Sequence, residues 1–216
     1  YGRGRNNVTP YGMTVEDNII EMVIDELDRS VDLKGWRDSV IAFNKTSPIV
    51  KKGLATMPVK FGISFNRPAL NQAGALVHVY MDGSVTLNHG GTEMGQGLQT
   101  KVLGVAMREL GLPAARIRMM PTSTDKVPNT SATAASSGAD LNGAAVRNAC
   151  ATLRDRLAPF AARLLSAKAG AAASAADVVF SDGQARLKSG QALSVPFSAV
   201  CEAAYLERVS LSATGY

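Results

Sequence analysis

Four glycines interleaved with polar residues mark the junction between a strand-like and a helix-like segment at residues 88–101. Apolar residues alternate before this junction, at Val85 and Leu87, and a helical pattern follows from about Leu98. Glycine allows backbone angles and close approaches that a β-carbon would forbid. A helix that begins near Gly97 would also present unpaired N–H groups and a partial positive charge. The junction therefore predicts a loop that holds a ligand, preferably an anion.

The spacing of these glycines excludes the two common nucleotide-binding loops. Residues 90–97 read Gly-Gly-Thr-Glu-Met-Gly-Gln-Gly. They match neither the Gly-x-x-x-x-Gly-Lys sequence of a P-loop nor the Gly-x-Gly-x-x-Gly sequence of a dinucleotide fold. Gln96 stands between two glycines, and its amide carries both donors and an acceptor. Gln96 is therefore the first candidate for ligand recognition.

The first quarter of the chain has a helical period. Thr14 has the form of an N-cap for an amphipathic helix. A second helix is expected between the turn at residues 32–35 and Pro48. We therefore treat residues 1–56 as an N-terminal helical segment.

The rest of the chain alternates between strand and helix patterns, which predicts an α+β fold of small mixed β-sheets with helices packed on them. Strands are expected from Met57 onward, and a helix is expected at about residues 98–110. A loop of small polar residues at 121–138 precedes a second long helical pattern. If the two loops face the same space, their helix dipoles would converge on one anionic ligand.

Composition excludes several classes of protein. The chain has 216 residues, 46% of them hydrophobic, so it can bury a real core. Its net charge of +5 could suggest nucleic acid, but basic and acidic residues are interleaved and no aromatic RNA-binding signature is present, so we expect no nucleic-acid partner. No run approaches the roughly 20 apolar residues that cross a bilayer, and no signal sequence opens the chain, so we expect a cytoplasmic protein without a membrane partner.

The two cysteines predict no metal site. Cys150 and Cys201 lie far apart in the sequence and belong to no Cys-x-x-Cys pair. Neither an iron–sulfur nor a zinc site is therefore indicated, and we expect buried, reduced thiols.

Four ordered segments resemble the xanthine dehydrogenase family of molybdenum hydroxylases: residues 60–65 (Lys-Phe-Gly-Ile-Ser-Phe), 71–76 (Asn-Gln-Ala-Gly-Ala-Leu), 90–97, and 127–136 (Val-Pro-Asn-Thr-Ser-Ala-Thr-Ala-Ala-Ser). The resemblance covers nearly the whole chain and is closest to the large molybdopterin-binding subunit of the bacterial type. It implies that residues 57–216 form a molybdenum-cofactor-binding domain. We expect this domain to be incomplete and to continue in a longer parent protein.

The resemblance implies that the glycine loop contacts the cofactor. Met94, Gly95 and Gln96 would lie against the pterin, with Gln96 as the polar recognition residue. Glu93 lies in the same motif and could be taken for a general base. The activating glutamate of the family belongs to a separate motif that does not occur here. We therefore assign Glu93 to stabilising the loop and expect no catalytic residue in this chain.

The resemblance also implies a role for the second loop. Thr133 and Ser136 would supply hydroxyl groups to the cofactor, and Ala134 would keep the approach narrow. Ala135 matches the family position whose backbone lies beside molybdenum. From the residues alone another interpretation stays open, in which Thr133 and Ser136 cap the helix that follows.

The resemblance places two further residues near the substrate. Phe65 matches a phenylalanine that packs against the aromatic substrate in the family, whereas alternation alone would make it a core residue. Asn66 stands where the family commonly has threonine, so substrate specificity is less certain than the hydroxylase chemistry. Because the family holds molybdenum through the dithiolene of its pyranopterin, we interpret His78 and His89 as a strand and a loop histidine without a metal role.

The implied parent is a molybdenum hydroxylase that oxidises hypoxanthine or xanthine with oxygen from water and passes electrons through [2Fe-2S] centres and FAD to NAD. The remainder of the large subunit and a small subunit with the Fe–S and FAD groups would be its partners, and the chain alone would be inactive. Two alternatives stay open. One is a subunit of an aldehyde or other heterocycle hydroxylase, and the other is a non-catalytic module for anion binding or assembly.

Overall fold

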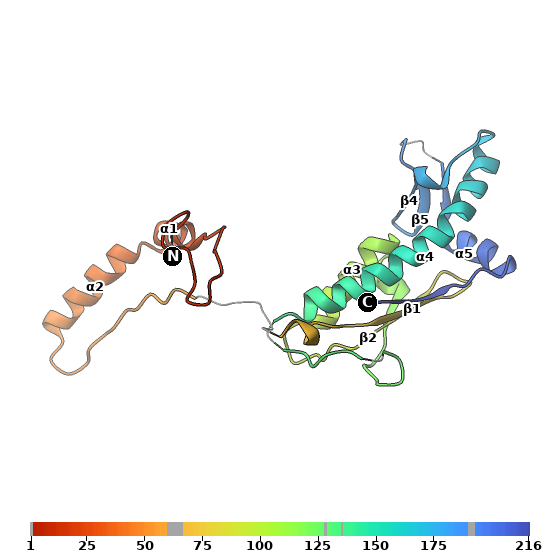
Figure 1. Cartoon of the computed structure of the whole chain (residues 1–216). Helices are drawn as coiled ribbons and strands as arrows, with labels where there is room; N and C mark the ends of the chain where they lie inside the picture. The colour runs from red at the N-terminus through yellow and green to blue at the C-terminus, as the bar shows by residue number, and fades with distance from the viewer. Residues whose placement is uncertain (1, 60–66, 128, 135, 190–192) are drawn as a thin grey trace. The chain divides into compact units, whose positions relative to one another are not determined.

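The computed structural model describes residues 2–59, 67–127, 129–134, 136–189 and 193–216. The chain forms two compact units, Tyr1–Phe61 and Gly62–Tyr216 (Figure 1). The domain boundary expected after residue 56 stays a prediction.

The first unit contains two helices that meet at Asp32. Helix α1 spans Ile20–Val31 and α2 spans Leu33–Thr46. Asp32 has a left-handed backbone with φ 48°, and its N–H donates to the carbonyl of Asp28 at 2.9 Å, which closes α1. Its Oδ1 accepts the N–H of Gly35 at 3.1 Å and so caps α2. The predicted second helix is confirmed.

Helix α1 begins at Ile20, so the N-cap predicted at Thr14 is wrong. Thr14 instead pairs with Val8 in an isolated antiparallel bridge, which holds its backbone extended. The first helical N–H, that of Ile20, is bonded to Oδ1 of Asn18 at 3.2 Å. An asparagine close to the helix thus provides the polar contact that was expected from the more distant threonine.

A mixed sheet forms the base of the second unit. Its strands are β1 (Ala75–Val79), β2 (Val85–His89), β3 (Ile117–Met119) and β7 (Ser212–Gly215). Their order is β3-β2-β1-β7, with β1 antiparallel to β2 and β7, and with β3 parallel to β2. A parallel pair needs a crossover connection, and here that connection contains the glycine loop and the helix after it.

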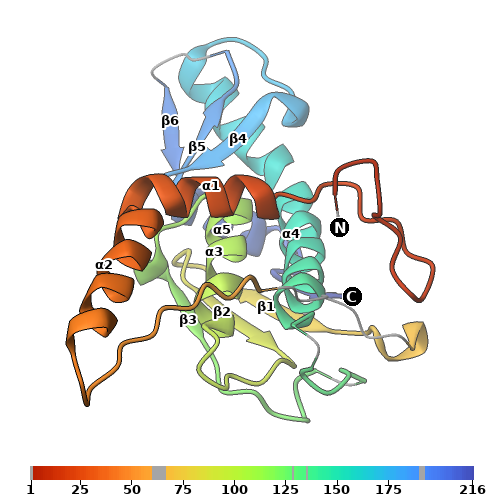
Figure 2. The same cartoon turned by 90° about the vertical axis from the view of Figure 1, so that its left-hand side faces the viewer.

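Two helices pack side by side on this sheet (Figure 1, Figure 2). Helix α3 spans Leu98–Leu110 and ends at Gly111, whose φ of 64° is left-handed, so the predicted helix and its terminal glycine are confirmed. Helix α4 spans Gly138–Ala169 and continues through Pro159. The site loops lead into the first turns of these two helices.

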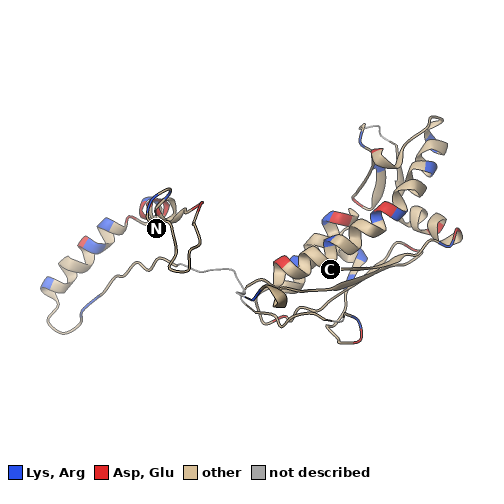
Figure 3. Ribbon diagram, viewed as in Figure 1, with Lys and Arg blue, Asp and Glu red and all other residues tan. Residues whose placement is uncertain are grey.

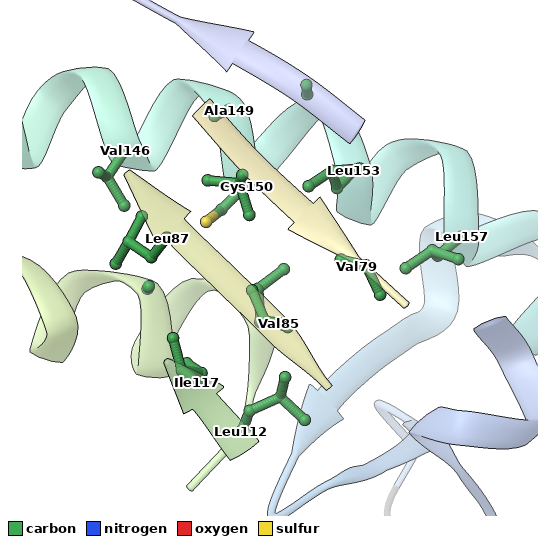
Figure 4. Close-up of a cluster of buried hydrophobic side chains, with 14 of the residues drawn as sticks. Val79, Val85, Leu87, Leu112, Ile117, Val146, Ala149, Cys150, Leu153 and Leu157 are labelled. Atoms are coloured by element: carbon green, nitrogen blue, oxygen red, sulfur yellow. The ribbon is translucent and has the colours of Figure 1, made fainter. Parts of the chain in front are cut away.

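The main core lies between α4 and the sheet (Figure 4). Leu153 and Leu157 of α4 are fully buried, as are Val77 and Leu87 of the strands. Burying one such side chain contributes about 1.5–3 kcal/mol. This packing fixes α4 over the sheet, and with it the start of the helix beside the glycine loop.

A smaller sheet lies against the C-terminal half of α4, where β4 (Val178–Ser181), β5 (Gln184–Leu187) and β6 (Ser194–Pro196) pair antiparallel in that order. Helix α5 (Phe197–Leu206) follows β6 directly. The rings of Phe180 and Phe197 meet edge to face with centroids 5.7 Å apart.

Short 3₁₀ helices occupy Pro68–Leu70, Ala114–Arg116 and Ala175–Asp177. These elements and the larger sheet agree with the predicted α+β class.

Both cysteines are free and buried, as predicted. Burial raises the pKa of the Cys150 thiol and of the Cys201 thiol to about 12. At neutral pH these groups are therefore protonated and unreactive.

Strand β7 crosses α4 so closely that residue 215 must be glycine. A β-carbon on Gly215 would overlap the carbonyl oxygen of Ala145 and would lie 2.6 Å from the N of Ala149, both in the α4 backbone. We expect Gly215→Ala to lower the free energy of unfolding by about 1–3 kcal/mol, the usual cost of overpacking.

Urea unfolding monitored by circular dichroism measures this change in the free energy of unfolding, with Gly104→Ala as the control. Gly104 lies inside α3 with no atom within 4 Å of an added β-carbon, so its replacement should stabilise the protein by up to about 1 kcal/mol. Equal unfolding midpoints for the two variants would contradict the close crossing.

Candidate functional site

The glycine loop and the second loop meet at one cavity of about 350 Å³. The cavity is lined from both sides by residues of the two loops and of the helices that follow them. From the first side come Met94, Gln96, Leu98 and Lys101, and from the second come Thr133, Ala134, Ser136, Gly138 and Ala139. The predicted convergence of the two loops on one space is therefore confirmed.

Hydrogen bonds within the protein join the two loops directly. The N–H of Thr92 donates to Oγ1 of Thr133 at 2.8 Å, across 41 positions of sequence. The hydroxyl of Thr122 donates to the carbonyl of Gly91 at 2.9 Å. Thr133 thus ties the second loop to the first, and it does not cap α4.

The first two glycines of the loop serve close packing. A β-carbon on Gly90 would overlap the side chain of Thr130, and one on Gly91 would lie 2.5 Å from Cδ2 of Leu98. Gly95, by contrast, has φ 97° with no atom within 4 Å of an added β-carbon. Gly90 and Gly91 therefore let the loop backbone pack closely against neighbouring side chains. Only Gly95 and Gly97 leave the open space for a ligand that we predicted for the glycines of this loop.

Glu93 occupies the amide groups that the sequence suggested for a ligand. Its Oε1 accepts the N–H groups of Gly95 at 2.9 Å and Gly97 at 3.0 Å, and its Oε2 accepts the N–H of Gln99 at 3.0 Å. The hydrogen bond from the Gln99 amide, followed by those from the other amides, holds the pKa of the Glu93 carboxyl below its usual value. The prediction that α3 offers free amides to an external anion is wrong, and the role of Glu93 in stabilising the loop is confirmed.

Gln96 also turns back on its own loop. Its Oε1 accepts the N–H of Met94 at 2.5 Å, and its Nε2 donates to the carbonyl of Thr92 at 2.8 Å. The side chain still lines the cavity. Gln96 therefore shapes the cavity wall from within the loop.

The electropositive part of the cavity lies at α4. Ser137, at the N-cap position, makes no side-chain hydrogen bond to the helix, and its hydroxyl donates instead to the carbonyl of Ala134 at 3.0 Å. Among the described residues, no side chain caps this first turn. Gly138 and Ala139 of the turn line the cavity, so the positive end of the α4 dipole faces that space.

Sequence reasoning missed Lys101. This lysine lies in the first turn of α3 and lines the cavity opposite α4. It stands three residues after Leu98, hence on a neighbouring helix position. That spacing was the only available signal, and it could not reveal that α4 lies across the cavity.

Several predicted site residues lie outside the described part of the chain: the substrate candidates Phe65 and Asn66, and Ala135 of the second loop. His78 is a β1 residue paired with Thr86, as its strand assignment predicted. No group of three or more His, Cys, Asp or Glu side chains suited to a metal occurs among the residues that the structure describes. Within the same residues, no helix has the length and apolar character to cross a bilayer.

Basic and acidic positions are interleaved along α2 and α4 (Figure 3). The charged residues of α4 illustrate the pattern, because Arg154, Asp155 and Arg156 follow one another. Arg154 is in turn paired with Glu109 of α3 at 3.0 Å. Arg154 and Arg156 do not line the cavity between the two loops, whereas Lys101 does.

Fold and site together define an α+β domain with a cavity between two loops, beside a helix N-terminus and a lysine. Residues 26–216 match the family model described as molybdopterin cofactor-binding domain. The chain therefore belongs to the molybdopterin cofactor-binding domain family. This match confirms the predicted cofactor class.

Relatives and solved structures agree with this assignment. The chain is 51% identical over 153 residues to the xanthine dehydrogenase/oxidase of Gallus gallus, which covers 71% of this chain and 11% of the relative. It is 41% identical over 209 residues to the xanthine dehydrogenase of Dictyostelium discoideum, covering 97% of this chain and 13% of the relative. The chain thus spans only 11–14% of the length of such xanthine dehydrogenases. The resemblance to the xanthine dehydrogenase family is confirmed.

The fold has a counterpart in quinoline 2-oxidoreductase from Pseudomonas putida 86. The two structures align with a TM-score of 0.74 at 22% identity, over 96% of this chain and 27% of that chain. At this identity the likeness concerns the fold alone. It confirms the predicted fold class.

We expect Glu93→Gln to loosen the glycine loop, because glutamine has one acceptor oxygen where the carboxylate has two. Hydrogen exchange at the amides of Gly95, Gly97 and Gln99 should accelerate. Since its folded-state pKa is lowered, Glu93 stabilises the loop above the usual carboxyl pKa of 4.5 and loses this effect as the pH falls through the lowered value. Wild-type protection should therefore decline only in that acidic range.

The control for this experiment is Glu202→Gln, which changes an exposed glutamate of α5. It should leave exchange at the three loop amides unchanged. Normal protection of those amides in Glu93→Gln would show that the carboxylate does not hold the loop.

Proposed function

We propose that this chain forms one wall of the molybdopterin site in a molybdenum hydroxylase related to xanthine dehydrogenase. The observation that carries the proposal is the cavity between the two loops, which has Lys101 on one side and the first turn of α4 on the other. Met94, Gly95 and Gln96 of the first loop and Thr133, Ala134, Ala135 and Ser136 of the second are the proposed cofactor-binding residues.

The donor set suits the cofactor. A phosphate-bearing group needs positive charge and N–H donors, which Lys101 and the α4 terminus can supply. Because the Glu93 carboxylate already accepts the N–H groups of Gly97 and Gln99 at the start of α3, the anionic end of the ligand should lie toward α4. The pterin would then lie against Met94 and Gln96, whose loop is held in shape by its own hydrogen bonds.

When bound, the molybdenum centre supplies two-electron oxidation chemistry in which water is the oxygen source. The residues of this chain bind and orient the cofactor and exclude water from its faces. Ala135 is proposed to bring its backbone beside the metal, and Phe65 and Asn66 are proposed to contact the substrate. The activating base, the [2Fe-2S] centres and FAD would come from other segments or from a partner subunit.

Hypoxanthine or xanthine is the proposed substrate, because the relatives described above are named as xanthine dehydrogenases. An aldehyde or another heterocycle is the second candidate. The observation in its favour is 44% identity over 185 residues to aldehyde oxidase 2 of Cavia porcellus, covering 86% of this chain and 12% of that protein. Substrate profiling of the parent enzyme distinguishes the two. The bacterial subunit arrangement and a cytoplasmic location stay predictions.

Lys101→Ala should reduce molybdopterin content in parent protein matured in a host that makes the cofactor. Losing a hydrogen bond to a charged group costs about 1.5–3 kcal/mol, hence roughly tenfold or more in affinity. Elemental mass spectrometry for molybdenum and pterin fluorescence after oxidation measure the content. Lys101→Arg should retain most of it, and Lys34→Ala, an exposed lysine of α2, should retain all of it. Full occupancy in Lys101→Ala would contradict the anionic end assigned to this wall.

Gln96→Ala should also lower pterin content, because it removes the hydrogen bonds to Met94 and Thr92 that shape the loop. The matched control is Gln99→Ala, which leaves the backbone N–H bonded to Glu93 in place. If the chain is instead a non-catalytic module, both variants of the parent will keep normal pterin content and activity.

A further inference from the structure

A histidine lies buried beneath the glycine loop. His89, interpreted from the sequence as a loop histidine, is the last residue of β2 and is only 2% exposed. Its Nδ1 accepts the N–H of Gly91 at 3.1 Å. An imidazole that accepts at Nδ1 must carry its proton on Nε2 and must be neutral. The structure therefore requires one protonation state of this ring.

The side chain of Asn142 lies beside this histidine, in the second turn of α4. It is 3% exposed, and its Nδ2 donates to the carbonyl of Gly138 at 2.8 Å. A β-carbon on Gly91 would lie 2.8 Å from Nδ2 of Asn142, so the asparagine also packs directly beneath the loop.

His89 and Asn142 are polar neighbours, and their contact tends to raise the pKa of the imidazole. Oδ1 of Asn142 nevertheless finds no partner in hydrogen-bonding geometry among the described residues. The two side chains are therefore in polar packing contact without a hydrogen bond between them.

The contacts of His89 with Gly91 and of Asn142 with Gly138 connect the two walls of the cavity behind its lining. Gly91 belongs to the first loop, and Gly138 begins the helix after the second. His89 and Asn142 stand between them, and neither lines the cavity itself. We propose that His89 and Asn142 are positioning residues that hold Gly91 at a fixed separation from the first turn of α4 and so set the width of the cofactor cavity. This inference rests on the function proposed above.

Protonation of His89 would disturb this arrangement. A proton on Nδ1 turns the acceptor of the Gly91 N–H into a second donor, so the two N–H groups would face each other and the loop would have to move. Burial lowers the pKa of His89 below 6.5, while Asn142 and the charge of Glu93 act in the opposite direction. Because the folded-state pKa is lowered, the stabilisation is complete above 6.5 and is lost as the pH falls through the lowered value.

Hydrogen exchange at the Gly91 amide in the full chain, measured by NMR from neutral pH down through the acidic range in which His89 titrates and corrected for intrinsic rates, tests the proposal without cofactor. His89→Leu removes the acceptor and should raise the exchange rate of Gly91 at least tenfold. His89→Asn offers an acceptor oxygen near the former Nδ1 and should restore protection. Wild-type protection should decline toward acidic pH, and that decline should be absent in His89→Asn. His78→Asn, the control, should keep the wild-type profile.

The same variants in the matured parent protein provide the second measurement, which is molybdenum and pterin content. His89→Leu and Asn142→Leu should lose most of the cofactor, and His89→Asn should retain it. If His89→Leu fails to fold, the comparison between wild type and His89→Asn decides the question.

Failure of this inference and failure of the proposed function give different results. The positioning role is overturned if Gly91 exchanges at the wild-type rate in His89→Leu, or if His89→Asn shows the wild-type pH profile. This holds even if the wild-type parent protein contains stoichiometric cofactor. Wild-type parent protein without cofactor, combined with the expected exchange profiles, overturns the proposed function and leaves the positioning role standing.

Discussion

The packing of α4 on the larger sheet is the constraint on which the site depends. Leu153 and Leu157 bury one side of the helix, and Gly215 lets β7 lie against its backbone. This packing fixes where the helix begins. Because α3 lies beside α4, the loops that precede the two helices are brought to the same end of the sheet, and the cavity forms between them.

The glycine loop satisfies its own polar groups before any ligand arrives. Glu93 binds the amides at the start of α3, and the amide of Gln96 bridges Met94 and Thr92. A loop already held in one shape loses little conformational entropy when a ligand binds. Under the proposed function, an anion would bind on the α4 side of the cavity, because the equivalent position on α3 is taken by the Glu93 carboxylate.

Local pattern was enough to predict the elements that depend on nearby residues. Helix α3 and its terminal Gly111 followed from apolar spacing and a left-handed glycine, and α2 followed from the turn at Asp32. The first helix lies where its apolar spacing placed it, but its start was misplaced because Thr14 is held by Val8, a partner that helical spacing does not reveal. The contacts that define the site were harder to predict. The bond between Thr92 and Thr133 joins residues 41 positions apart, and the role of Lys101 depends on where α4 lies.

The measurement that tests this account most directly is an experimental density map of the cofactor-loaded parent protein. The account predicts a phosphate-bearing ligand between the two loops, with its anionic end within hydrogen-bonding distance of Lys101 and the first turn of α4, and with the Glu93 carboxylate still on the amides of α3. A ligand bound outside this cavity, or one whose anionic end has displaced Glu93 from α3, would contradict it.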